Sequence, residues 1–119
     1  MAYHLSYQEP VSIRTGQLAW RDLWENQRPW DLVEGWYNYE KFIEAVLPTL
    51  PENARIVEVG SWFGQSSIGI ASLSRRLKKN ARIFCVDTWE GSNETGHQER
   101  IRALHGSGAG GVYDEFLRN

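Results

Sequence analysis

The sequence predicts an α/β fold in which parallel strands alternate with helices. Residues 55–71 read RIVEVGSWFGQSSIGIA, a short β-branched run followed by a glycine-bearing turn and the start of a helix. A second apolar run, ARIFCV over residues 81–86, comes after that helix and leads directly into Asp87. Short apolar runs without long alternation are typical of parallel strands that are covered on both faces. We therefore expect strands over residues 55–60 and 81–87, joined by a helix.

Length and composition limit the class of protein. With 119 residues the chain has room for one small domain. Hydrophobic residues make up 41% and charged residues 24%, which is a globular rather than a disordered composition. The net charge of −2 gives no electrostatic argument for nucleic acid, and no apolar run is long enough to span a bilayer. Because Cys85 has no second cysteine to pair with, we expect a packed thiol in a soluble, cytoplasmic protein.

Residues 1–37 are predicted to form an N-terminal arm rich in tryptophan. Val11 and Ile13 alternate with polar residues, which predicts a short edge strand. Trp20 and Trp24 lie at helical spacing before a proline, which predicts a helix.

The arm also contains Trp30 and Trp36, for which two interpretations are open. One is a hydrophobic anchor that packs the arm onto the core. The other places one of these two rings over an adenine or a substrate ring.

Residues 38–119 are predicted to form a partial cofactor-binding domain. Asn38 has the character of an N-cap, and apolar residues at helical spacing follow it as far as Leu50. Further helices are expected over residues 97–105 and near residues 112–117. The glycine-rich run 106–111 follows no strand, so we do not interpret it as a phosphate-binding loop.

The turn after the first strand has the features of a cofactor site. Gly60 and Gly64 permit a sharp turn and a close backbone approach. Ser66 and Ser67 open a helix whose free N–H groups point back at the turn. Asp87 follows Gly60 by 27 positions, close to the roughly 20-residue offset at which an acidic residue contacts a ribose in dinucleotide-binding folds. A carboxylate suits this position because it accepts hydrogen bonds from a vicinal diol.

Taken together, these residues resemble class I S-adenosylmethionine-dependent methyltransferases. The resemblance covers residues 55–91 and rests on two runs, Glu58-Val59-Gly60 with Gly64, Ser66 and Ser67, and Val86-Asp87-Thr88-Trp89. Trp62 stands where the general pattern has a middle glycine. The chain is therefore more similar to the subgroup that contains small-molecule and sugar O-methyltransferases.

The resemblance implies a partial Rossmann-like fold, S-adenosyl-L-methionine as cofactor and a small-molecule methyl acceptor. It places Gly60, Ser61 and Gly64 against the methionine part of the cofactor, with Glu58 beneath it and reaching the amino group directly or through water. Ser66 and Ser67 would offer hydroxyls or amides at the helix start. Asp87 would hold the ribose, and Thr88 and Trp89 would flank the adenine. His4, His97 and His105 lie too far apart for a metal site and are interpreted as surface residues.

Structural alternatives stay open for three of these residues. Glu58 is also consistent with a strand-end carboxylate paired with helix amides. Asp87 is also consistent with a loop acid or a cap, and Trp89 with plain packing. Two other functions are open as well: a non-catalytic binding or assembly module, and an NAD-dependent oxidoreductase, which Trp62 disfavours because the backbone must approach a pyrophosphate there.

The family builds a sheet of about seven strands, whereas two parallel strands are predicted here. We therefore expect the cofactor-binding part of a longer protein, without the substrate-binding half, and no catalytic residue is assigned. The strand at 55–60 would then have an exposed, apolar edge, and such edges pair with other chains. This predicts a homodimer or a larger oligomer that covers the edge.

Overall fold

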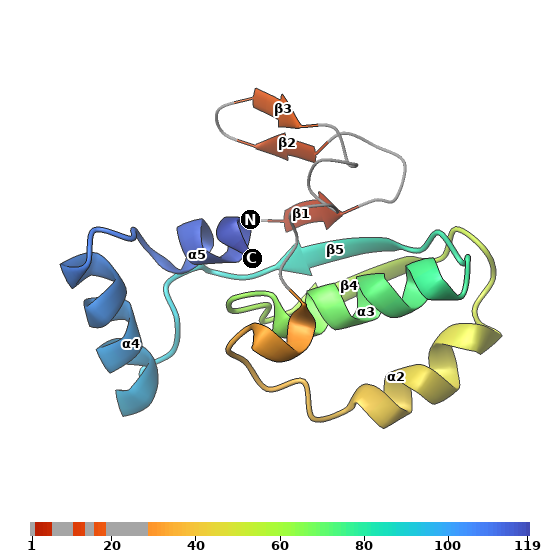
Figure 1. The fold of residues 1–119 in the computed structure, drawn as a ribbon, viewed down its shortest axis with the longest axis horizontal. Coiled ribbons are helices and arrows are strands. Elements are labelled where there is room, and N and C mark those ends of the chain that lie inside the picture. The colour runs from red at the N-terminus through yellow and green to blue at the C-terminus, as the bar shows by residue number, and fades with distance from the viewer. Residues whose placement is uncertain (1, 6–10, 14–15, 19–28) are drawn as a thin grey trace.

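The computed structural model describes residues 2–5, 11–13, 16–18 and 29–119. Figure 1 shows the arrangement of its elements. The strands are β1 (Ala2–Leu5), β2 (Val11–Ile13), β3 (Gly16–Leu18), β4 (Arg55–Val59) and β5 (Arg82–Val86). The helices are α2 (Glu40–Val46), α3 (Gln65–Arg76), α4 (Thr95–Gly106) and α5 (Val112–Arg118), together with the 3-10 turns η1 (Trp30–Leu32) and η2 (Leu47–Thr49). The helix predicted around Trp20 and Trp24 lies outside the described residues.

The two predicted strands form a parallel pair. β4 and β5 run side by side with Ile56 opposite Ile83 and Val57 opposite Phe84, and α3 connects them. β1 pairs antiparallel with the other edge of β5, which gives the strand order β1-β5-β4. The predicted edge strand at residues 11–13 is confirmed as β2, which forms a hairpin with β3. The structure therefore mixes helices and strands around a parallel β4–β5 pair, with an antiparallel strand that the sequence did not predict.

The prediction that β4 is buried on both faces is wrong. Its residues alternate: Ile56 is partly buried and Glu58 is buried, whereas Val57 is 64% and Val59 79% exposed. α3 packs over one face of the sheet (Figure 1), so burial on that face follows the pleat. Among the described residues, no element covers the two valines on the other face.

The helix α3 confirms the strand-turn-helix prediction. It begins immediately after Gly64, and its apolar residues Ile68, Ile70 and Leu73 are buried. Ile70 packs into one core cluster with Ile83 and Cys85 of β5. This packing fixes the start of α3 at the carboxyl end of β4.

The helix α2 differs from the prediction at its start and in its burial. Tyr39, rather than Asn38, occupies the N-cap position, and it makes no side-chain capping bond. The helix ends at Val46 and continues as the short turn η2 because Pro48 cannot continue an α-helical hydrogen-bond ladder. Phe42 is 64% exposed, so the predicted apolar face is only partly used.

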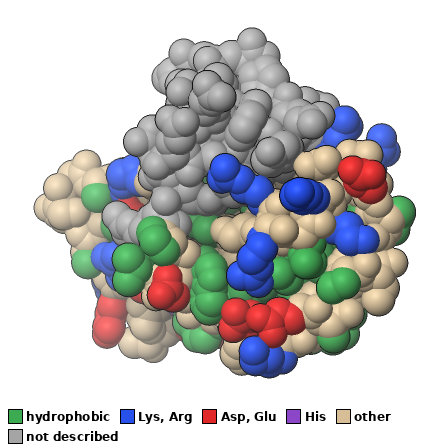
Figure 2. Space-filling model, turned by 45° about the vertical axis from the view of Figure 1, so that its right-hand side comes forward, with side chains coloured by type: hydrophobic (Ala, Val, Ile, Leu, Met, Phe, Trp, Pro, Cys, Tyr) green, Lys and Arg blue, Asp and Glu red, His purple; other side chains and the backbone are tan. Residues whose placement is uncertain are grey.

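The last two helices, α4 and α5, agree with the predicted helices over residues 97–105 and near 112–117. Phe116 of α5 belongs to the core cluster of α3 and β5, while Leu104 and Val112 join a second cluster around Trp62 and Phe63. No helix in the described part of the chain is long and apolar enough to cross a membrane. Figure 2 shows basic, acidic and apolar side chains interspersed on the face that it displays.

Candidate functional site

The loop between β4 and α3 contains two glycines in the left-handed region. Gly60 has φ +83° and Gly64 has φ +92°, values that glycine adopts without steric cost. The Gly60 N–H donates to the Val86 carbonyl of β5 at 2.8 Å, which ties the turn to the neighbouring strand. A Cβ on Gly60 would meet nothing within 4 Å, whereas one on Gly64 would lie 3.0 Å from the Phe116 ring. Gly60 therefore borders open space, and Gly64 makes room for α5.

Glu58 lies in a buried polar network beneath this loop. The carboxylate is 8% exposed, and its two oxygens accept hydrogen bonds from the Ser66 and Ser67 hydroxyls. The Tyr39 hydroxyl lies 3.5 Å from Glu58 Oε1. The partners of Glu58 are thus side-chain hydroxyls rather than the helix amides of the alternative interpretation.

Cys85 lies next to this network and confirms the prediction of a packed thiol. Its side chain is 0% exposed. Burial raises the pKa of the Cys85 thiol to about 11, so the thiol stays protonated at neutral pH.

Asp87 joins the two loops that follow β4 and β5. Its Oδ2 accepts from the Trp62 N–H at 2.9 Å, and its Oδ1 accepts from the Trp89 N–H at 2.8 Å. Both tryptophans have positive φ, +51° for Trp62 and +64° for Trp89, a conformation that costs free energy in a residue with a Cβ. The carboxylate offsets this strain by holding both N–H groups. A structural role for Asp87 is thus visible, beside which ribose binding stays a prediction.

The side chains of Thr88 and Trp89 lie in different surroundings. Thr88 is exposed, and its hydroxyl accepts from the Glu90 N–H at 3.3 Å. The Trp89 ring packs against Tyr113 and Phe116 of α5, with ring centroids 5.3 and 4.7 Å apart. Trp89 therefore contributes to the core, as its packing interpretation requires.

A cavity of about 190 Å³ opens beside Gly60. Its walls come from the segment before α2, the end of β4, the loop and the start of α3, and they are formed by Gly35, Trp36, Tyr39, Val59, Gly60, Ser61, Trp62, Gln65 and Ser66. Of the predicted site residues, Gly60, Ser61 and Ser66 meet here. Glu58 lies behind the wall, bonded to Ser66. Gly64, Ser67, Asp87, Thr88 and Trp89 are not part of the lining.

Among the other lining residues, sequence reasoning missed Tyr39 and Gln65 and left Trp36 open. Gln65 fastens the segment before α2 to α3, because its Nε2 donates to the Val33 carbonyl at 2.7 Å and its Oε1 accepts from the Tyr37 N–H at 2.8 Å. Trp36, 59% exposed, lies at the cavity and had been one of two candidates for ring stacking. No local pattern marks Tyr39 or Gln65, because their contacts cross about 20 to 30 residues of sequence.

His97 is not the surface residue that the sequence predicted. Its ring stacks on Trp62 at 4.3 Å between centroids and touches Trp36 at 4.8 Å. Its Nδ1 lies 2.6 Å from the Ser92 hydroxyl. His97 thus supports the outer wall of the cavity through Trp62. Within the described residues, no group of three or more His, Cys, Asp or Glu side chains could hold a metal ion.

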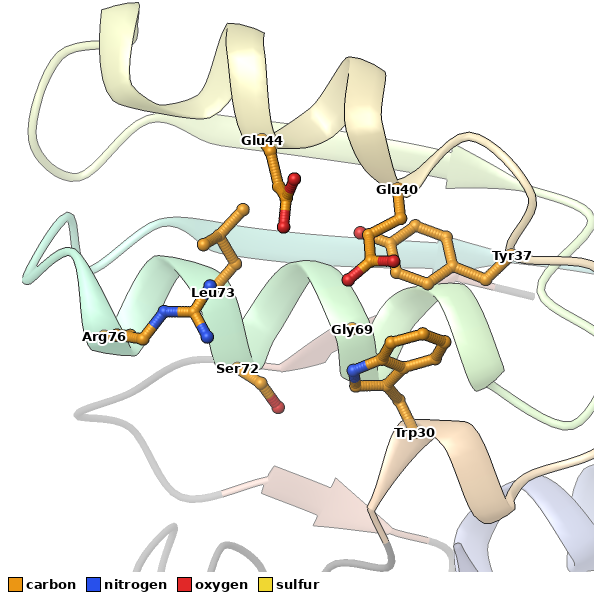
Figure 3. A pocket seen from close by; sticks show the side chains of 8 residues that line it. All are labelled: Trp30, Tyr37, Glu40, Glu44, Gly69, Ser72, Leu73 and Arg76. Carbon is orange, nitrogen blue, oxygen red and sulfur yellow. The ribbon is translucent and has the colours of Figure 1, made fainter.

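A second, smaller cavity of about 40 Å³ lies between α2, α3 and η1 (Figure 3). Glu40 and Glu44 of α2 point toward it, with the Tyr37 ring beside Glu40 and the Trp30 ring on the η1 side. Burial, and then the charge of Glu40, raises the pKa of Tyr37 to about 12. A volume of this size holds only a few waters, so we consider the larger cavity the candidate site.

Comparison of the chain with protein-family models finds no match. Neither the curated proteins nor the solved structures give one. A functional assignment therefore depends on the motif and on the geometry of the larger cavity.

Proposed function

We propose that this chain forms the S-adenosylmethionine-binding part of a methyltransferase with a small-molecule acceptor. The observation that carries the proposal is the position of the larger cavity, at the carboxyl end of β4 and beside the first turn of α3. In open α/β sheets, ligands bind outside the carboxyl ends of parallel strands. The cavity occupies that position and contains the motif residues Gly60, Ser61 and Ser66.

The residues around the cavity fit one end of such a cofactor. At Gly60 the backbone borders open space, so a ligand can approach it without meeting a side chain. Ser66 presents a hydroxyl from the start of α3. A volume of about 190 Å³ is below the roughly 300–1,000 Å³ of typical small-molecule sites, which favours a cavity that takes the amino-acid end and leaves the adenosine outside it.

Asp87 remains the proposed ribose ligand, although its carboxylate already accepts hydrogen bonds from the protein. Each carboxylate oxygen already accepts one backbone N–H. A carboxylate oxygen can accept more than one hydrogen bond, so a vicinal diol would share the Asp87 carboxylate with these N–H groups.

When bound, S-adenosylmethionine supplies a methyl group on a sulfonium, which is activated towards attack by an acceptor. The role of this chain is to hold the sulfonium end in place, since such transfer depends mainly on positioning. Gly60 lets the ligand approach the backbone, and the Ser66 hydroxyl binds its polar end. Asp87 holds together the loops that contain Trp62 and Trp89.

Calorimetric titration with S-adenosylhomocysteine and with NAD tests the proposal. We expect S-adenosylhomocysteine to bind and NAD not to bind, because the Trp62 side chain stands where a pyrophosphate needs bare backbone. Asp87→Ala is expected to weaken S-adenosylhomocysteine binding by about 1–3 kcal/mol through the loss of diol acceptors and loop order.

The matched control is Asp31→Ala, which removes an exposed carboxylate from η1 and should leave the affinity unchanged. Circular dichroism of each variant separates lost binding from lost folding. Binding of NAD alone would overturn the proposal, and binding of neither ligand would instead support a non-catalytic module.

A further inference from the structure

Three oxygen atoms from different elements converge on one wall of the larger cavity. The Ser66 hydroxyl, at the start of α3, donates to Glu58 Oε1. The Tyr39 hydroxyl, from the N-cap of α2, lies 3.5 Å from the same oxygen. Tyr39 and Ser66 line the cavity, while Glu58 is 8% exposed behind them.

This arrangement makes the wall an acceptor of hydrogen bonds. A hydroxyl that gives its proton to a carboxylate keeps its lone pairs for another donor. The pKa of the Tyr39 hydroxyl is raised by burial and by the Glu58 charge, so the phenol keeps its proton at neutral pH. The negative charge of Glu58 strengthens hydrogen bonds from a cationic donor to these hydroxyls. The wall therefore suits an ammonium group.

Another lining residue, Trp36, also suits a cation. The Trp36 ring lines the cavity and is 59% exposed. Tryptophan faces attract ammonium groups within about 6 Å of the ring centroid. Gln65 fixes the backbone on both sides of Trp36 through Val33 and Tyr37.

Tyr39 is held in position by its neighbour. Its ring packs edge-on against Tyr37 at 5.2 Å between centroids. Tyr37 in turn lies over Gly69, where a Cβ would come within 2.3 Å of the Tyr37 ring. The contact with Tyr37 supports the ring of Tyr39, a residue that is 39% exposed.

We infer that Tyr39 determines ligand specificity by selecting molecules that carry an ammonium group at this end of the cavity. The inference rests on the proposed function, in which that ammonium belongs to the amino-acid part of S-adenosylmethionine. Tyr39 lies outside the glycine-bearing motif and precedes Gly60 by 21 positions.

The test compares two ligands that differ in this group. S-adenosylhomocysteine carries the α-amino acid, whereas 5′-methylthioadenosine has the same nucleoside and thioether without it. We expect Tyr39→Phe to raise the Kd of S-adenosylhomocysteine about 3- to 10-fold and to leave that of 5′-methylthioadenosine unchanged, as measured by calorimetry. Ser66→Ala should show the same selective loss.

Tyr37→Phe is the matched control, since its hydroxyl lies at the smaller cavity (Figure 3), and it should change neither affinity. Unchanged S-adenosylhomocysteine binding by Tyr39→Phe, or an equal loss for both ligands, would overturn this inference alone. Failure of the wild-type protein to bind S-adenosylhomocysteine would overturn the proposed function and this inference with it.

Discussion

Gly60 and Gly64 have similar backbone conformations but different surroundings. Both have φ above +80°. A side chain on Gly60 would project into open space beside the cavity, whereas one on Gly64 would meet Phe116 at 3.0 Å. The motif predicts that both glycines serve the cofactor. The packing instead gives Gly64 a second reason to be glycine, which is the close approach of α5.

This difference predicts that Gly64→Ala destabilises the fold. The substitution adds backbone strain at positive φ and a clash with the Phe116 ring, which together should lower the free energy of unfolding by about 1–3 kcal/mol. Urea denaturation measures the effect. Gly96→Ala is the control, because Gly96 lies in α4 with nothing within 4 Å of the added Cβ. An equal midpoint for Gly64→Ala and the wild type would contradict the packing account.

Sequence reasoning found the site residues that belong to a local motif and missed those that reach it from elsewhere. Gly60, Ser61 and Ser66 lie within seven consecutive positions and meet at the cavity. Tyr39 reaches the same wall from 19 residues before Glu58. His97 stacks on Trp62 across 35 positions, and no spacing rule relates the two. Such contacts depend on how the helices pack, which a linear pattern does not encode.

At the scale of elements, the secondary structure of β4 and α2 is predicted correctly, but their burial is not. The β-branched run of β4 predicts a strand, and the strand is there. Burial on both faces requires a second covering layer, and within the described residues only the α3 face has one. The apolar spacing of α2 likewise predicts a helix, but Phe42 points to solvent.

The exposed valines of β4 bear on self-association. β4 is an edge strand in the described sheet, with Val57 64% and Val59 79% exposed. Apolar edge strands pair with other chains, so we expect association through β4 at micromolar concentration. Sedimentation velocity should show oligomers that Val57→Thr combined with Val59→Thr shifts towards monomer.

Leu32→Thr is the control for that experiment. Leu32 is 68% exposed but lies in the 3-10 turn η1 and is not part of a strand. Its replacement should leave the oligomers intact. A wild-type protein that sediments as a monomer throughout the concentration range would exclude association through β4.

For the whole molecule, the order of β4, α3 and β5 could be predicted from the sequence. The strand that pairs with β5 and the position of the cavity could not. β4, α3 and β5 follow one another within 32 residues, so local patterns suffice. β1 pairs with β5 across the chain, with Tyr3 opposite Cys85, and such a distant pairing leaves no local trace. The cavity itself forms where the segment before α2 lies over the loop after β4. Its position therefore depends on the full arrangement.

The most direct test of the central claim locates the ligand on the protein. In a ¹⁵N–¹H titration with S-adenosylhomocysteine, we predict saturable shifts of the amides of Gly60, Ser61, Trp62 and Ser66, which line the larger cavity. Gly69 and Ser72, at the smaller cavity, should not shift. An absence of shifts at saturating ligand, or shifts confined to the smaller cavity, would contradict the account.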